Sequence, residues 1–171
     1  MISYRVIPVL LLSEGGLVKT EKFKKPVYVG DPINAIRIFN DKEVDELVFL
    51  DIDASKENRG PDFTLLEQIA SECFMPLGYG GGITTLDQVK HIYSTGIEKV
   101  ILNSVVFDKP KLLEDAAAEA GNQSVVVSID YKKALFGKTK VYSHAKRKTP
   151  NMSVIEFAKE MESRGAGELI L

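Results

Sequence analysis

The sequence has little of what several large classes of protein require. Its 171 residues contain one cysteine, two histidines and no tryptophan. A single cysteine, Cys73, excludes an internal disulfide and a cysteine-cluster metal site, and it suits a reducing compartment. No stretch reaches the roughly 20 apolar residues of a membrane-spanning helix, and the N-terminus lacks a signal-peptide pattern. We therefore expect a cytoplasmic protein that does not interact with membranes.

Excess charge of one sign is also absent. The 22 basic and 24 acidic residues give a net charge of −2, whereas nucleic-acid binding calls for a basic stripe. The run Lys146-Arg147-Lys148 is typical of a solvated loop. His91 and His144 are too isolated for a catalytic triad or a metal site, and no dinucleotide-binding glycine pattern occurs. We expect no nucleic acid, no metal and no cofactor.

Short apolar runs alternate with helical patterns along the chain. The runs predict strands over residues 4–12, 47–52, 75–79, 100–103, 124–130 and 169–171. The periodic segments predict helices over residues 32–44, 63–73, 86–94, 110–120 and 154–163. Near-continuous apolar strands are typical of a parallel sheet covered on both faces. Strand–helix alternation then predicts βαβ units with right-handed crossovers.

This order predicts an α/β protein of the TIM (β/α)8 barrel class, with the chain covering strands one to six as a single partial domain over residues 1–171. A closed barrel needs eight strands and about 250 residues. We therefore expect a fragment, the alternative being that the missing strands come from elsewhere. Insertions near residues 13–29 and 132–149 predict hairpins after strands one and five, at the catalytic face of a barrel.

Local signals predict where three of the helices begin. Ser153 with Glu156 three residues later is a capping box. Asp108, just before Pro110, is typical of an N-cap residue. If the glycine run that precedes the third helix is only a tight turn, Thr84 is the N-cap expected there.

That glycine run is a candidate anion site. Gly80, Gly81 and Gly82 separate a strand from a helix, where backbone N–H groups can approach an anion at a positive helix terminus. A tight turn is the alternative, but three consecutive glycines exceed what a turn needs. Asn103 and Ser104 close the next strand, so these residues could together hold one phosphate between adjacent strand ends.

Carboxylates follow other strands at the same end of the sheet. Asp51 and Asp130 are candidates for binding substrate, and Asp130 is the stronger candidate for a general acid or base, or for holding a substrate hydroxyl. For Asp53 we favour a cap of the following loop. Lys19, on the first insertion, either clamps a phosphate or is a solvated lysine.

Four charged residues enter strands from the opposite end: Arg5, Glu46, Lys99 and Glu168. A closed barrel would gather them into a ring at its base. Unpaired charges there would be costly, so the simplest interpretation is a plug of ion pairs.

In this order, these residues resemble the cyclase subunit of imidazole glycerol phosphate synthase. The matching stretches are residues 5–7, 15–19, 30–32, 45–55, 80–83, 99–104, 125–130 and 164–168. The resemblance runs over nearly the whole chain. It implies a lyase subunit that takes ammonia from a glutaminase docked at the N-terminal face of the barrel and joins it to a phosphorylated small-molecule substrate.

The resemblance also implies roles for individual residues. The four strand-entry charges would form the ammonia gate. Gly82, Asn103 and Ser104 would hold one substrate phosphate, and Lys19 would help to close over the substrate. Asp130 matches one of the two catalytic aspartates of the family.

The second catalytic aspartate is missing, because Leu11 stands at its position. A leucine cannot exchange a proton, and losing an acid/base group typically removes roughly two to four orders of magnitude in rate. Glu14 is a poor substitute, because a loop positions a proton donor badly. The departure resembles paralogues that, with a sugar amidotransferase of surface-polysaccharide (lipopolysaccharide) pathways, supply nitrogen for an amidine on a nucleotide sugar.

Three functions therefore stand. We favour nitrogen delivery for sugar amidination, with a genuine cyclase of histidine biosynthesis as the first alternative and a non-catalytic scaffold or fragment as the second.

Overall fold

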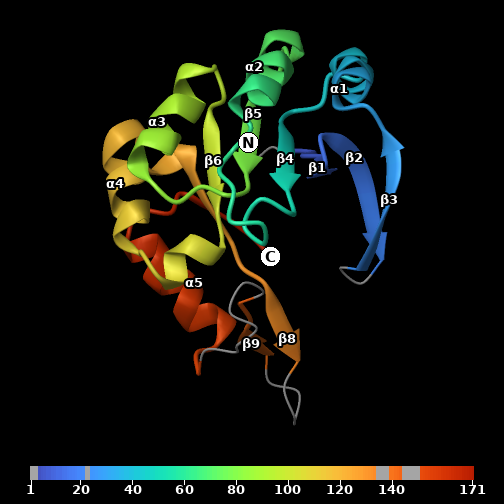
Figure 1. The fold of residues 1–171 in the computed structure, drawn as a ribbon. Helices are drawn as coiled ribbons and strands as arrows, with labels where there is room; N and C mark the ends of the chain where they lie inside the picture. The colour runs from blue at the N-terminus through green and yellow to red at the C-terminus, as the bar shows by residue number, and fades with distance from the viewer. Residues whose placement is uncertain (1–3, 22–23, 134–138, 144–150) are drawn as a thin grey trace.

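The computed structural model describes residues 4–21, 24–133, 139–143 and 151–171. Within them one sheet has the strand order β10-β7-β6-β5-β4-β1-β2-β3. Its parallel strands are β1 (Val9–Ser13), β4 (Leu47–Asp51), β5 (Leu77–Gly80), β6 (Lys99–Leu102), β7 (Val125–Ser128) and β10 (Glu168–Ile170). The sheet curls, and the helices lie along its outer side (Figure 1). This is the arrangement of the first six strands of a (β/α)8 barrel, so the predicted fold class is confirmed.

Five α-helices connect or follow these strands. They are α1 (Pro32–Asp41), α2 (Phe63–Glu72), α3 (Leu86–Ser94), α4 (Lys111–Ala120) and α5 (Val154–Ser163). Two short 3-10 helices, η1 (Ser104–Phe107) and η2 (Asn122–Ser124), flank α4. Each α-helix lies within two or three residues of its predicted bounds, because apolar periodicity marks its inward face.

One predicted helix start is confirmed and two are wrong. Ser153 caps α5 in the expected capping box with Glu156. Asp108 does not cap α4, because η1 occupies residues 104–107 and Asp108 ends it; Pro110 precedes α4 without a side-chain cap. The cap of α3 is Thr85, not Thr84.

The first predicted strand is shorter than expected, beginning at Val9 rather than at residue 4. Pro8 precedes it and lacks the N–H that a ladder needs, although its carbonyl accepts from Val48. After β1 the chain forms the antiparallel pair β2 (Gly16–Glu21) and β3 (Lys24–Gly30). After β7 it forms a second antiparallel pair, β8 (Tyr131–Lys133) and β9 (Thr139–Val141).

Two apolar layers position the functional ends of the strands. On the outer face, residues such as Phe49 and Leu102 pack beneath the helices in the main core. On the inner face, Val48, Ile101 and Val126 form a separate cluster in the barrel interior. Because side chains alternate along a strand, each barrel strand is packed on both faces by apolar residues. The polar residues lie at the two ends of the strands. None of the helices in the described part of the chain is long and apolar enough to cross a membrane.

Candidate functional site

The rim at the N-terminal ends of the parallel strands, called the lower rim from here on, carries a closed cycle of ion pairs. Arg5 Nη1 lies 3.0 Å from Glu46 Oε2, and Arg5 Nη2 lies 2.9 Å from Glu168 Oε1. Lys99 Nζ lies 2.7 Å from Glu46 Oε2 and 2.8 Å from Glu168 Oε1. Each carboxylate therefore bridges both cations. The structure brings together the four strand-entry charges expected from the sequence.

These charges are partly withdrawn from water. Glu46 is 3% exposed, whereas the Arg5 side chain is 47% exposed and covers the ring from below. Burial raises the pKa of Glu168, but hydrogen bonds from Lys99 and Arg5 outweigh it and hold that pKa below its usual value. The pKa of Arg5 is raised, chiefly by its hydrogen bond to Glu168. Both shifts favour the charged forms of Glu168 and Arg5, and the ring as a whole combines two basic with two acidic side chains.

An apolar cavity of about 440 Å³ stands above the ring. Its walls include Ile7, Val9, Val48, Val126 and Ile170, and the ring carboxylates line its floor. The barrel interior thus offers a small neutral molecule a path with few polar groups above the ring.

The opposite rim, at the C-terminal ends of the parallel strands, is called the upper rim. It has a different kind of pocket, of about 340 Å³, between the loops after β4, β5 and β6. Gly82 and Ser104 both line it, as the sequence predicted for a phosphate site. Lys109 also lines it and donates to the carbonyl of Thr84 at 3.4 Å. Backbone amides, a hydroxyl and a cation suit an anionic group.

The glycine run fits closely against the loop after β4. A Cβ on Gly82 would lie 2.3 Å from the carbonyl oxygen of Arg59, and one on Gly81 would lie 2.7 Å from Asp51. Both glycines have positive φ, and the Gly82 N–H donates to Ser55 Oγ at 3.4 Å. The run must therefore be glycine so that the two loops can meet.

Asp51 organises this loop through hydrogen bonds from Arg59 and from two backbone N–H groups. Arg59 Nη1 donates to its Oδ2 at 2.7 Å, and Arg59 Nη2 donates to its Oδ1 at 3.0 Å. The N–H groups of Asp53 and Ala54 also donate to Oδ1. The hydrogen bonds that Arg59 donates to Asp51, and next the one that it donates to Glu57, raise the pKa of Arg59. The geometry gives Asp51 a bracing position beneath the pocket; its predicted part in substrate binding stays a prediction.

Two further candidate site residues, Asn103 and Asp130, meet just past the ends of the neighbouring strands β6 and β7. Asn103 Nδ2 donates to Asp130 Oδ2 at 3.0 Å, although 27 residues separate them. Asp130 also accepts the Tyr142 N–H at its carbonyl, which ties it to the second hairpin. The amide thus fixes the orientation of the Asp130 carboxylate; neither residue is among those that line the pocket at Gly82 and Ser104.

Leu11 lies on the inner face of β1, since it follows the cavity-lining Val9 by two residues. It pairs with Leu50 of β4, so this level of the inner face is apolar on both strands. Lys19 is exposed on β2 and is not among the residues that line the pocket. Glu14 occupies a positive-φ turn, away from the β1 ladder.

Sequence patterns missed two parts of the upper rim. Arg59 lacked any signal, because its role depends on the fold of a loop. Ser13 Oγ donates to Asp53 Oδ2 at 2.5 Å, which joins the ends of β1 and β4. The two strands are far apart in sequence, and only the parallel pairing places them side by side.

Other predicted features have structural settings. Cys73 is half-buried at the end of α2, and burial raises the pKa of its thiol. The His91 ring stacks on Phe63 with centroids 3.8 Å apart, so it packs between α3 and α2. His144 and the basic run 146–148 lie outside the described residues.

Comparison with known proteins identifies the family of this chain. A family described as "Histidine biosynthesis protein" matches residues 5–171. Proteins named "Putative imidazole glycerol phosphate synthase subunit hisF3" in Vibrio vulnificus and "Putative imidazole glycerol phosphate synthase subunit hisF2" in Pseudomonas aeruginosa are 52% and 51% identical to this chain. A Leptospira interrogans protein named "Putative imidazole glycerol phosphate synthase subunit HisF" is 49% identical.

These matches cover 100% of this chain and 66%, 68% and 68% of the respective relatives. The chain therefore spans about two thirds of the length of the curated relatives it matches. The fold is that of a (β/α)8-barrel protein. The chain belongs to the histidine biosynthesis protein family, and within it the chain is HisF-like.

Proposed function

We propose that the full-length protein is an ammonia-handling subunit. It receives ammonia from a glutaminase docked at the N-terminal face of the barrel, passes it through the Arg5-Glu46-Lys99-Glu168 ring, and supplies it at the upper rim to build an amidine on a nucleotide sugar. Gly82 and Ser104 hold a phosphate of the acceptor, and a sugar amidotransferase is the further partner.

The charged ring with the apolar cavity above it supports passage of ammonia. Neutral ammonia enters an apolar cavity at modest cost, whereas an ammonium ion would lose its hydration without a partner there. The ring is neutral as a whole and each charge has two partners. Swinging the half-exposed Arg5 outward opens the ring while Lys99 still pairs with both carboxylates.

Leu11 is the single observation that carries the choice of amidination over cyclisation. At the upper rim Asp130 is braced by Asn103, but the inner face of β1 offers Leu11 where the family has a carboxylate. A cyclase that exchanges protons through two carboxylates has lost one of them. Delivery of ammonia needs only the ring and the cavity.

One observation favours a second candidate, a cyclase of histidine biosynthesis. The Asn103–Asp130 bond lies beside the pocket that Gly82 and Ser104 line, so one acid/base and one phosphate site remain adjacent. The names of the relatives are also those of this synthase.

The test measures turnover of the bisphosphorylated ribulosyl aminoimidazole substrate by full-length protein with saturating ammonium salt. Wild type is compared with Leu11→Asp and with Leu11→Asn, which is equally polar but cannot exchange a proton. We expect wild type and Leu11→Asn to be inert. Activity gained only by Leu11→Asp would show that the pocket still holds this substrate and that the acid/base was lost.

Inactivity of all three would point to a pocket that fits another acceptor, as amidination requires. Wild-type turnover at a rate ordinary for enzymes would instead overturn the amidination proposal and establish the cyclase.

A further inference from the structure

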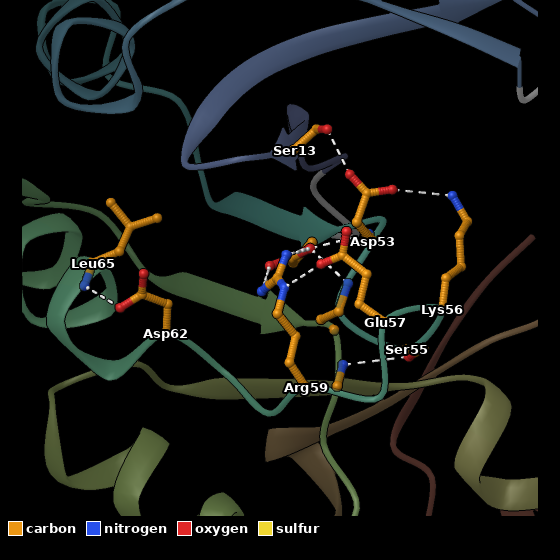
Figure 2. A network of polar contacts seen from close by, with 12 residues as sticks. Ser13, Asp53, Ser55, Lys56, Glu57, Arg59, Asp62 and Leu65 are labelled. Carbon is orange, nitrogen blue, oxygen red and sulfur yellow. Dashed lines mark hydrogen bonds and ion pairs between the residues drawn. The ribbon is translucent and has the colours of Figure 1, made fainter.

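A polar pair stands directly above Leu11. Ser13 follows Leu11 by two residues on β1, so it shares the inner face about 7 Å nearer the upper rim. Its hydroxyl donates to Asp53 Oδ2 at 2.5 Å, and Figure 2 shows the two side chains meeting across the strand ends. The inner face that lacks a carboxylate at Leu11 therefore gains one a single pleat higher, from the loop that follows β4.

Asp53 retains the capacity to bind a ligand. Lys56 Nζ donates to its Oδ1 at 3.2 Å, and its side chain is 20% exposed. An ionised carboxylate offers about four acceptor sites, and Ser13 and Lys56 use two of them. The hydrogen bond from Ser13, supported by Lys56, lowers the pKa of Asp53, so it is an acceptor at neutral pH. The loop cap predicted for Asp53 leaves part of the group unused.

Asp53 also begins the loop that closes on the phosphate pocket. The next residue, Ala54, packs 3.0 Å from the Cβ position of Gly82, and Ser55 Oγ accepts the Gly82 N–H. Asp53 does not itself line this pocket, but it lies two residues before Ser55, which does, so a ligand that extends from Gly82 toward the end of β1 would reach it.

We propose that Asp53, oriented by Ser13, binds a sugar hydroxyl of a phosphorylated carbohydrate whose phosphate lies against Gly82 and Ser104. An acceptor-only carboxylate is well suited to receive hydroxyl hydrogens, as acidic residues do at ribose. Lys56 offsets the charge of Asp53 beside the ligand phosphate. This inference rests on the phosphate site of the proposed function and adds the residue pair that recognises the sugar of the acceptor.

The experiment compares two probes that share a phosphate and differ in hydroxyls: ribose 5-phosphate and inorganic phosphate. Both are titrated calorimetrically into full-length wild type, Asp53→Asn, Ser13→Ala and the matched control Asp62→Asn. Asp62 caps α2 on the same loop, far along the chain from Ser13. We expect wild type to bind ribose 5-phosphate more tightly than phosphate.

In Asp53→Asn we expect affinity for ribose 5-phosphate to fall about tenfold, the effect of one charge-assisted hydrogen bond, with inorganic phosphate within about twofold. Ser13→Ala should shift affinity the same way by less, because Asp53 remains but loses its orientation. Asp62→Asn should change neither.

Equal losses for both probes would mean that Asp53 only supports the phosphate loop, and would overturn the inference. So would unchanged ribose 5-phosphate binding in Asp53→Asn, although the phosphate site would stand. If wild type binds neither probe, the proposed phosphate site fails and the inference fails with it.

Discussion

The two rims of this barrel handle charge in opposite ways. At the lower rim the charged groups come from strand entries and pair only with one another, in a cycle of bonds of 2.7–3.0 Å. At the upper rim the carboxylates are held by loops: Asp51 by Arg59 and backbone N–H groups, Asp53 by Ser13 and Lys56.

This difference matches what each rim does in the proposed function. A ring at the strand entries with equal numbers of basic and acidic side chains suits selective passage of a small neutral molecule. Loop-held carboxylates keep unused acceptor sites and can meet a ligand. Loss of a group should therefore cost mainly stability at the lower rim and mainly ligand affinity at the upper rim.

The largest expected effect is that of Lys99→Met at the lower rim. Lys99 is 12% exposed and bonds both carboxylates, so its removal leaves buried Glu46 with Arg5 alone. Breaking a buried ion pair typically costs about 3–5 kcal/mol. Urea unfolding of the full-length protein should show a loss of that order.

Two controls sharpen this prediction. Lys111→Met removes an exposed pair with Asp115 and should cost under about 1 kcal/mol. Adding Glu46→Gln to Lys99→Met should restore part of the stability, because it removes the uncompensated charge. An equal loss for Lys111→Met and Lys99→Met would contradict the contrast between ring and surface.

The next largest effect is expected for Gly82→Ala at the upper rim. The new Cβ would lie 2.3 Å from the Arg59 carbonyl oxygen, at a φ of +66°. Strain and overlap together should cost about 2–4 kcal/mol, and inorganic phosphate binding should be lost. Gly96→Ala is the control, since it also has positive φ but open space around it. If Gly96→Ala abolishes phosphate binding too, the close fit at Gly82 is not the cause.

A smaller effect is expected for Arg59→Met. This change removes a two-pronged bond to Asp51 and a bond to Glu57, and should cost about 1–3 kcal/mol while weakening phosphate binding. Arg37→Met breaks one exposed contact of 3.5 Å with Glu72 and should be nearly silent in both measurements. Unaltered phosphate affinity in Arg59→Met would show that the pocket does not depend on this brace.

The smallest effect is a change in pH dependence at the lower rim. The folded-state pKa of Glu168 lies below its unfolded value of about 4.3. Its contribution to stability is therefore present above that value and is lost as pH falls through the folded pKa. Glu168→Gln should flatten the decline of unfolding free energy in this acid range, whereas exposed Glu162→Gln should not. Parallel declines in wild type and Glu168→Gln would refute this link.

Much of the lower rim could be predicted from the sequence, and less of the upper rim. Arg5, Glu46, Lys99 and Glu168 each enter a strand, and strand entries of a parallel barrel necessarily meet. Arg59 and the Ser13–Asp53 pair depend on how one loop folds, which no period encodes.

The misassigned helix starts have a similar cause. From the sequence, Thr84 and Thr85 are equally good N-cap residues for α3. Gln88 decides between them: its side-chain oxygen accepts from both threonine N–H groups, and its backbone N–H donates to Thr85 Oγ1. Asp108 is not the N-cap of α4 because the 3-10 helix η1 ends at it. The apolar residues of η1 read as a continuation of the preceding strand, so the sequence pattern did not predict this helix.

The central claim is that the ring admits ammonia from a docked glutaminase. The most direct measurement is glutamine hydrolysis by the glutaminase of the same organism, alone and with full-length protein, as wild type and as Lys99→Met. The account predicts that wild type binds and stimulates the glutaminase, and that Lys99→Met still binds while ammonia released to bulk solvent rises. A glutaminase that neither binds the wild-type protein nor is stimulated by it would contradict the account.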